Sequence, residues 1–337
     1  MRHMRECLRK IVHALKGGTP AELVVVTEAS GSTPRGAGAL MAVFPGGRFL
    51  GTIGGGNVEY EAQRLAAELL ERGGSALRRF RFVQGDAASL GMVCGGDVAV
   101  RFQYLPAGDR RVVAVLRDLM EASAGNLDTW LVLNLQEDHA VMGAADRNGS
   151  RHLDSPPAGL SALLQNRTVL SEGWLAVPVV RAGRVYIFGG GHVSRALVPA
   201  ADAAGFRPVV YDDRPEFADP ALFPQAESVL SGDFTKIGEK ITLTADDYVV
   251  IMTRGHQADY EVLEQTLRSG VKYLGCIGSR RKLTLCRERL LAAGFTAEEY
   301  AAVHAPIGLP IGAETPEEIA VSVTAQLIAV RAGLSGT

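Results

Sequence analysis

Short apolar runs alternate with amphipathic segments along the second half of the chain. Each run is rich in β-branched or aromatic residues, and the segment after it repeats apolar positions every three or four residues. Such alternation of strand and helix is typical of a parallel, doubly wound sheet. The predicted strands cover residues 185–188, 208–211, 228–230, 248–252 and 273–277, and the predicted helices cover 192–204, 260–269, 280–293 and 316–330.

The first half mixes strands and helices less regularly. An apolar stripe of Val58, Ala62, Leu65 and Leu69 predicts a helix that ends at Gly73. Strands are predicted over 23–27, 39–44, 48–53, 77–83 and 98–104, followed by a helix over 111–124 and a weak β region over 129–144. We therefore predict a mixed α/β N-terminal domain over residues 1–175 and a C-terminal Rossmann-type domain, with a doubly wound parallel sheet, over residues 183–330.

Composition and charge exclude several classes of protein. Among 337 residues, 35 Lys and Arg oppose 37 Asp and Glu, so the net charge of -2 provides no basic field for nucleic acid. No apolar run reaches the ~18 residues that a membrane span needs. Residues 1–15 carry basic residues between apolar positions at helical spacing, which predicts an amphipathic helix and not a signal peptide. Four scattered cysteines without a CxxC pair predict a cytoplasmic protein without disulfides.

Glycine is enriched, with 39 residues, and one cluster has the spacing of a dinucleotide-binding loop. Gly189, Gly190 and Gly191 follow a predicted strand and precede a predicted helix that begins at His192. Ser194 stands where the third glycine of the fingerprint usually lies. A helix N-terminus offers free amides and a positive dipole end to a phosphate. Either the loop binds a phosphate-bearing ligand, or its glycines serve packing alone.

Polar residues also follow the other predicted parallel strands, where Rossmann folds bind their ligands. Asp212 or Asp213 lies 23 or 24 residues after Gly189, close to the spacing of the acid that receives a ribose hydroxyl. Two further groups follow the next strands. They comprise Thr253, Arg254, His256 and Asp259 after one strand, and Ser279, Arg280, Arg281 and Lys282 after the other.

Each of these two groups has a functional and a structural interpretation. A serine at a helix N-terminus with three cations would clamp an anion, or the stretch from Ser279 to Lys282 is a solvated basic helix start. His256 is either a functional histidine at a strand end or a structural one.

A second glycine-rich loop in the first half would expose consecutive backbone amides. Gly54, Gly55 and Gly56 run from a predicted strand into a predicted helix, which forms a nest for an anion that Arg35 could complement. Glu59 falls in the first turn of that helix, where capping and catalysis are both reasonable roles. The structural alternative is a tight turn followed by a helix cap.

Cys94 differs from the other cysteines because glycines flank it in a loop between two strands. A lone cysteine is usually a small buried apolar residue. Free amides near the sulfur would instead favour a thiolate, which is a soft ligand for a transition metal or a carrier of sulfane sulfur. Cys7, Cys276 and Cys286 lie in apolar, periodic segments and are predicted to be core residues.

Several sequence blocks, spread over nearly the whole chain, form a recognisable set. The first half contributes 31–35 (GSTPR), 51–56 (GTIGGG) with Glu59, and 94–96 (CGG). The second half contributes 189–192 (GGGH), 212–215 (DDRP), 253–256 (TRGH) with Asp259, 278–282 (GSRRK) and 308–320. In this order the blocks resemble the XdhC/CoxI family, although residues 105–180 match weakly and Ser194 replaces a glycine.

The resemblance implies a role that no single motif indicates. Proteins of this family are accessory factors of xanthine dehydrogenase and related molybdenum hydroxylases. They bind the molybdenum cofactor, as molybdopterin or its cytosine dinucleotide form, hold it while a cysteine desulfurase helps to install the terminal sulfido ligand, and deliver it to the apoenzyme. By this resemblance Cys94 lies nearest the molybdenum, as ligand or sulfur relay, and the protein is a maturation factor, not an enzyme. Two glycine-rich surfaces in one chain suit a homodimer.

Two other functions compete with this one. The Rossmann fingerprint alone predicts an NAD(P)-dependent oxidoreductase, in which His256 and Asp259 would act as acid and base. The third class is a nucleotide-sensing adaptor, whose Rossmann site would regulate docking to a partner.

Overall fold

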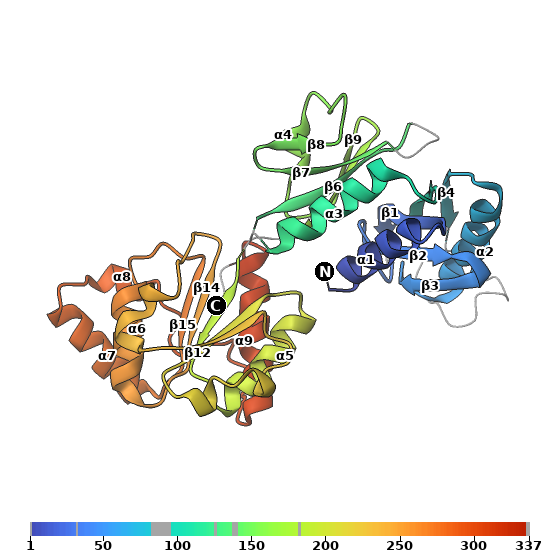
Figure 1. Ribbon diagram of the computed structural model, residues 1–337. Coiled ribbons are helices and arrows are strands. Elements are labelled where there is room, and N and C mark those ends of the chain that lie inside the picture. The colour runs from blue at the N-terminus through green and yellow to red at the C-terminus, as the bar shows by residue number, and fades with distance from the viewer. Residues whose placement is uncertain are drawn as a thin grey trace. The chain divides into compact units, whose positions relative to one another are not determined.

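Two structural units follow one another along the chain, residues 1–181 and residues 182–337 (Figure 1). The computed structural model describes residues 2–31, 33–81, 96–124, 127–136, 141–180 and 183–334. Within these ranges no helix has the length and apolar character that crossing a membrane requires.

The first unit contains an antiparallel sheet of five strands. β1 pairs with β2 on one side and with β5 on the other, so that Val24 lies opposite both Met41 and Phe102. The strand order is β3-β2-β1-β5-β4. The strands are β1 (Ala21–Gly31), β2 (Leu40–Phe44), β3 (Arg48–Gly51), β4 (Ala76–Arg81) and β5 (Gly96–Leu105), with the short 3-10 turn η1 (Pro45–Gly47) between β2 and β3.

Helices cover both faces of this sheet. On one face α2 (Gly56–Arg72) buries Ala62, Ala66 and Leu69 against the strands. On the other face α1 (Arg2–Lys16) and α3 (Arg110–Ala124) share a core with β1, β2 and β5. The helix predicted from the apolar stripe of residues 58–69 is therefore present, because those side chains face the sheet.

A second antiparallel sheet completes the first unit. It packs on the far side of α1 and α3, since apolar residues of β6, β7 and β10 join the same core as those helices. Its order is β8-β7-β6-β10-β9. Only a weak β region over 129–144 is predicted here, and the structure adds three strands beyond it. The elements are β6 (Thr129–Asn134), β7 (Met142–Asp146), β8 (Gly149–Arg151), α4 (Leu160–Leu163), β9 (Val169–Ser171) and β10 (Trp174–Val180).

The second unit is built on a parallel sheet with the order β13-β12-β11-β14-β15. Each neighbouring pair is parallel, and the order is that of a nucleotide-binding Rossmann half with two further strands. The predicted Rossmann-type fold is confirmed. The strands are β11 (Val185–Phe188), β12 (Pro208–Asp212), β13 (Ser228–Ser231), β14 (Tyr248–Ile251) and β15 (Tyr273–Cys276).

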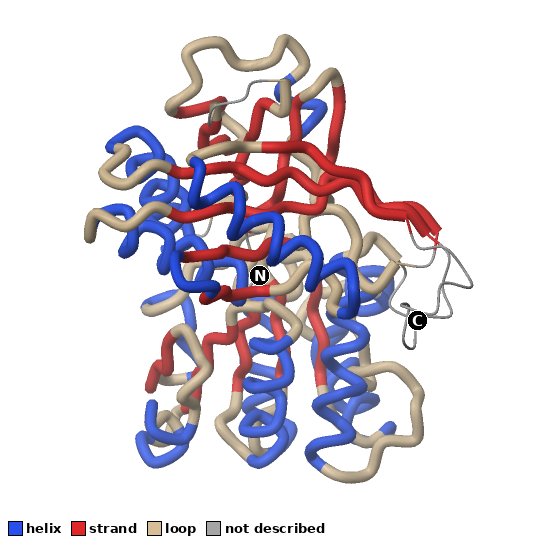
Figure 2. The backbone as a smooth tube through the Cα atoms, turned by 90° about the vertical axis from the view of Figure 1, so that its right-hand side faces the viewer, coloured by secondary structure: helices blue, strands red, loops and turns tan. Residues whose placement is uncertain are grey.

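Helices line both faces of the parallel sheet (Figures 1 and 2). One core joins it to α5 (His192–Ala203) and α9 (Pro316–Arg331), and another joins it to α6 (Gly255–Thr266) and α7 (Arg280–Ala292). The shorter helices are η2 (Pro215–Phe217), η3 (Pro220–Leu222), η4 (Phe234–Glu239) and α8 (Ala297–Ala301). Helix α6 begins five residues earlier than the predicted 260, so His256 and Asp259 lie on its first turns and not in a loop.

Candidate functional site

The glycine loop of the second unit lies between β11 and α5, at the carboxyl edge of the parallel sheet. Gly189 has a φ of +108°, and a Cβ atom there would lie 2.3 Å from the carbonyl oxygen of Met252, directly after β14. This position therefore requires glycine. A Cβ on Gly191, the N-cap of α5, would meet nothing within 4 Å. The loop is thus closely packed at its start and open where the helix begins.

Ser194 fixes this loop from inside the helix. The residue is 1% exposed, and its hydroxyl donates a hydrogen bond to the carbonyl oxygen of Gly189. A glycine at this point usually allows close packing of helix on strand. Here a hydrogen bond ties the first turns of α5 to the loop instead, so the departure from the fingerprint keeps the loop in place.

Asp212, the acid expected to meet a ribose hydroxyl, instead accepts hydrogen bonds from neighbouring residues of the chain. It is 1% exposed, and its carboxylate accepts hydrogen bonds from the amide of Gly190 at 2.7 Å and from the guanidinium of Arg214 at 3.0 and 3.1 Å. Burial raises its pKa, but the hydrogen bonds from Arg214 and Gly190 outweigh burial and hold the pKa below its usual value. Asp213 is more exposed, and its carboxylate lies 3.1 Å from Arg254.

Asp259 also has its hydrogen-bond and ion-pair partners within the protein. The residue is fully buried, accepts hydrogen bonds from the amide and hydroxyl of Thr253, and forms an ion pair with Lys282. It therefore joins the end of β14 to the start of α7. His256, one turn earlier on α6, is exposed. Asp259 thus points into the protein while His256 lies on its surface, which is not the arrangement expected of an acid and base serving one substrate.

The predicted anion clamp at the start of α7 is partly present. Ser279 is the N-cap, and its hydroxyl oxygen accepts a hydrogen bond from the amide of Lys282 at 3.4 Å. Arg280 and Arg281 are exposed, whereas the charge of Lys282 is balanced by Asp259. Two cations, and not three, are therefore available to a ligand at this helix start.

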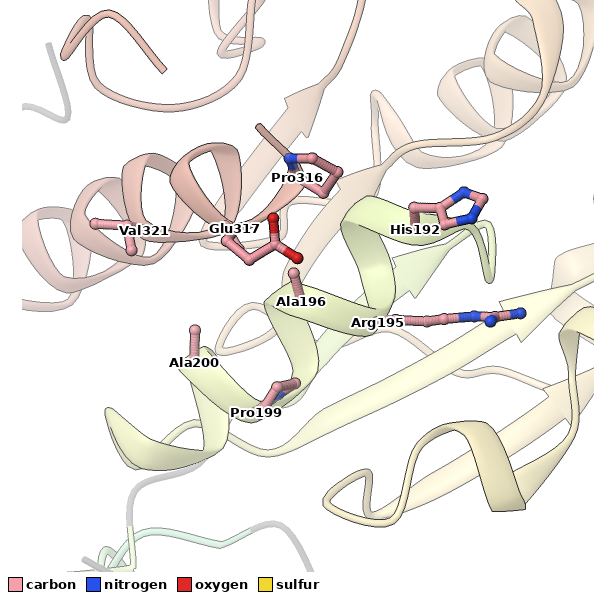
Figure 3. A pocket seen from close by; sticks show the side chains of 9 residues that line it. His192, Arg195, Ala196, Pro199, Ala200, Pro316, Glu317 and Val321 are labelled. Carbon is pink, nitrogen blue, oxygen red and sulfur yellow. The ribbon is translucent and has the colours of Figure 1, made fainter. Parts of the chain in front are cut away.

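A surface cavity of about 560 Å³ runs between α5 and α9 beside the glycine loop (Figure 3). His192 and Arg195 of α5 and Glu317, in the first turn of α9, are among the residues that line it. The remaining lining is apolar or small. Its volume is within the range of small-molecule sites. Arg195 and Glu317 were not predicted, because nothing in the sequence indicates that the two helices lie side by side.

In the first unit, the amide nest before α2 already holds a carboxylate. Glu59 accepts hydrogen bonds from the hydroxyl of Thr52 at 2.5 Å and from the amides of Ile53, Gly54 and Gly55 at 2.9, 3.3 and 3.0 Å. Burial raises the pKa of Glu59, but these hydrogen bonds outweigh it and lower the pKa overall. Of the two roles considered for Glu59, the geometry corresponds to capping.

The remaining predicted residues of the first unit lie near this nest or outside the described residues. Arg35 is exposed, and its backbone amide lies 3.6 Å from the place that a Cβ on Gly54 would take. Gly56 is the first residue of α2. Cys94 lies within residues 82–95, outside the described part of the chain. In the ranges that are described, no group of three or more His, Cys, Asp or Glu residues is arranged to hold a metal ion.

Comparison with protein families decides where the chain belongs. The profile of the XdhC and CoxI family matches residues 14–81, and the profile of the XdhC Rossmann domain matches residues 185–327. The chain belongs to the XdhC and CoxI family. The first match contains Arg35 and the Glu59 nest. The second contains the mouth of the parallel sheet, by which we mean the glycine loop 189–191 and the residues that follow β12, β14 and β15.

Three curated relatives of this XdhC and CoxI family member align with more than nine-tenths of it. YqeB of Escherichia coli, an uncharacterised protein, is 27% identical over 94% of the chain, which spans only 44% of that protein. A probable subunit of xanthine dehydrogenase from Bacillus subtilis is 25% identical over 92% of the chain and 93% of its own length. The molybdenum cofactor insertion chaperone PaoD of Escherichia coli is 26% identical over 97% of the chain and 88% of its own length.

A solved structure shares the fold. The crystal structure of a xanthine dehydrogenase from Bacillus halodurans superposes with a TM-score of 0.81 and covers 98% of this chain and 96% of its own. At 24% identity this likeness shows the fold alone.

Proposed function

We propose that this XdhC and CoxI family member is an accessory protein that binds the molybdenum cofactor and inserts it into a molybdenum hydroxylase of the xanthine dehydrogenase type. The observation that carries the proposal is the alignment with PaoD, a molybdenum cofactor insertion chaperone, over 97% of this chain and 88% of that protein. The alignment with a probable subunit of xanthine dehydrogenase supports the class of client.

The mouth of the parallel sheet provides groups suited to such a cargo. The molybdenum cofactor carries a phosphate, or a diphosphate in its cytosine dinucleotide form. The open N-terminus of α5 at Gly191 and the exposed guanidinium groups of Arg280 and Arg281 are suited to binding such an anion. Arg254 and His192 are also at this edge. In this proposal they hold the phosphate end of the cargo.

Cys94 is assigned to the molybdenum end of the cargo. A thiolate is a soft ligand, suited to molybdenum or to carrying a sulfur atom from a cysteine desulfurase. The proposal therefore includes three partners: the desulfurase, the apo-hydroxylase and a second copy of this chain, all in the cytoplasm.

The test is activation of an apo-hydroxylase by cofactor-loaded protein, in the presence of a cysteine desulfurase and cysteine. Cys94→Ala should fold normally but activate the client poorly. Cys7→Ala is the matched control, because Cys7 is fully buried in the same unit and burial raises its pKa to about 11, so it carries little thiolate near pH 7. Full activation by Cys94→Ala would remove the assigned role of Cys94.

A second candidate, an NAD(P)-dependent oxidoreductase with His256 at its centre, follows from the Rossmann fold alone. That function requires hydride transfer, seen as a cofactor-dependent change in absorbance with a small carbonyl or alcohol. The activity must disappear in His256→Ala. An absence of client activation together with such turnover would establish the second candidate in place of the first.

A further inference from the structure

The acid at the end of the second strand normally receives the adenosine ribose in a Rossmann fold. Asp212 occupies this position as the last residue of β12. A carboxylate has about four lone-pair sites. In Asp212 one oxygen accepts from the amide and Nε of Arg214, both at 3.0 Å, and the other accepts from the amide of Gly190 at 2.7 Å and Nη2 of Arg214 at 3.1 Å. All four sites are filled from within the chain.

The turn after Asp212 closes over the same place. A Cβ on Gly190 would lie 2.1 Å from the carbonyl oxygen of Phe217, so the backbone of this turn is in direct contact with the glycine loop. The guanidinium of Arg214 lies 3.6 Å from the centre of the Phe217 ring, and the amide of Phe217 donates to the carbonyl oxygen of Arg214 at 3.0 Å. Arg214 therefore has two roles. Its contacts with Phe217 hold the turn in place, and its guanidinium group neutralises the charge of Asp212.

The neighbouring acid offers a ribose no free replacement. Asp213 has a carboxylate that lies 3.1 Å from Arg254 and 3.7 Å from Arg214. A ribose hydroxyl would compete with two guanidinium groups for it. In contrast, the next residue of the loop, Gly191, faces open space. The mouth is thus closed on the side of the second strand and open at the start of α5.

We propose that Arg214, through Asp212 and the turn Pro215–Phe217, is a specificity determinant that makes this Rossmann site refuse NADH. The site accepts a phosphate-bearing ligand that places no ribose on the second strand. The inference rests on the proposed function only for the identity of that ligand as the pterin cofactor. The refusal itself is a property of these contacts.

The test measures binding of NADH to the full-length protein by isothermal titration calorimetry. Wild type should not bind NADH in the micromolar range. Arg214→Ala removes the two side-chain donors to the Asp212 carboxylate, leaves the two backbone amides, and should tighten the Kd for NADH at least ~10-fold. Adding Asp212→Asn to Arg214→Ala should abolish the gain. The matched control, Arg195→Ala, removes an exposed guanidinium on α5 and leaves the ion pairs of Asp212 and Asp213 in place, so it should gain no NADH binding.

Several results overturn the proposal. Micromolar binding of NADH by wild type does so without any variant, even where Arg214→Ala fails to fold. A folded Arg214→Ala protein without the gain, or a gain that survives Asp212→Asn, removes Arg214 or Asp212 from the assigned role. Cofactor retention and client activation are independent readouts. Binding of NADH by a wild type that still activates its client would defeat this inference and leave the proposed function standing.

Discussion

The carboxylate of Glu59 should account for a measurable share of the stability of the first unit. Its Oε2 atom accepts four hydrogen bonds, from Thr52 and the amides of Ile53, Gly54 and Gly55. Losing one N-terminal cap costs about 0.5–2 kcal/mol, and hydrogen bonds to a charged group contribute about 1.5–3 kcal/mol each. Because one oxygen is shared and the loop is half-exposed, Glu59→Ala should lower the free energy of unfolding by about 2 kcal/mol.

The effect should depend on pH with a defined sign. The pKa of Glu59 lies below its ordinary value of 4.5 in the folded protein. Its contribution is therefore complete above the unfolded pKa of 4.5 and is lost as the pH falls through the lower folded pKa. The free energies of unfolding of wild type and Glu59→Ala should show their full difference at pH 7 and become equal in acid.

Urea unfolding followed by tryptophan fluorescence measures this directly, because both tryptophans of the chain, Trp130 and Trp174, lie in the first unit. Glu61→Ala is the matched control, since Glu61 is two residues away on α2 and forms only an exposed ion pair with Arg64. It should change stability by less than about 0.5 kcal/mol. Equal midpoints for Glu59→Ala and Glu61→Ala would refute the reasoning.

The emptied nest should also bind an added anion. With inorganic phosphate at about ten times a Kd for the nest, Glu59→Ala should recover about 1.4 kcal/mol, whereas wild type, with the nest filled, should gain much less. An equal gain in both proteins would mean that phosphate acts elsewhere.

Two further stability predictions follow from buried carboxylates. Burial raises the pKa of Glu22 to about 9, although Arg101 opposes this shift, so the folded protein holds a proton that the unfolded chain releases above pH 4.5. Stability is therefore lost as the pH rises towards 9, and Glu22→Gln should stabilise the first unit by about 3 kcal/mol at pH 7 in urea titrations; an unchanged pH profile contradicts this. Asp259→Ala leaves Lys282 without its partner and should destabilise the second unit by about 2 kcal/mol in calorimetry, while an unchanged transition contradicts the assigned ion pair.

The parallel sheet was well predicted because each of its strands is a local signal. The apolar runs at 185–188 and 248–252 lie between turns and amphipathic helices, and they form adjacent strands β11 and β14. The second sheet of the first unit was mostly missed. Its strand β10 (Trp174–Val180) contains Pro178, and its partner β9 (Val169–Ser171) has three residues, so neither carries a strong periodic pattern.

The chemistry of the site depends on contacts that spacing does not encode. The sequence placed Glu59 in the first turn of a helix, but only the path of residues 52–55 directs the hydroxyl of Thr52 and the amides of residues 53–55 to its carboxylate. The spacing after Gly189 identified Asp212 correctly as the end of the second strand. It could not indicate that Arg214 folds back on Asp212, or that Lys282 pairs with Asp259 from another helix. Such tertiary pairings decide which charges are available to a ligand.

Anaerobic cofactor retention tests most directly whether this protein carries the molybdenum cofactor. Wild-type protein is mixed with molybdenum cofactor released from a molybdoenzyme, passed through a desalting column, and assayed for molybdenum and pterin, with NADH in a parallel run. We predict that molybdenum and pterin are retained together in stoichiometric amounts and that NADH is lost. Loss of molybdenum and pterin together with stoichiometric retention of NADH would contradict the proposed function.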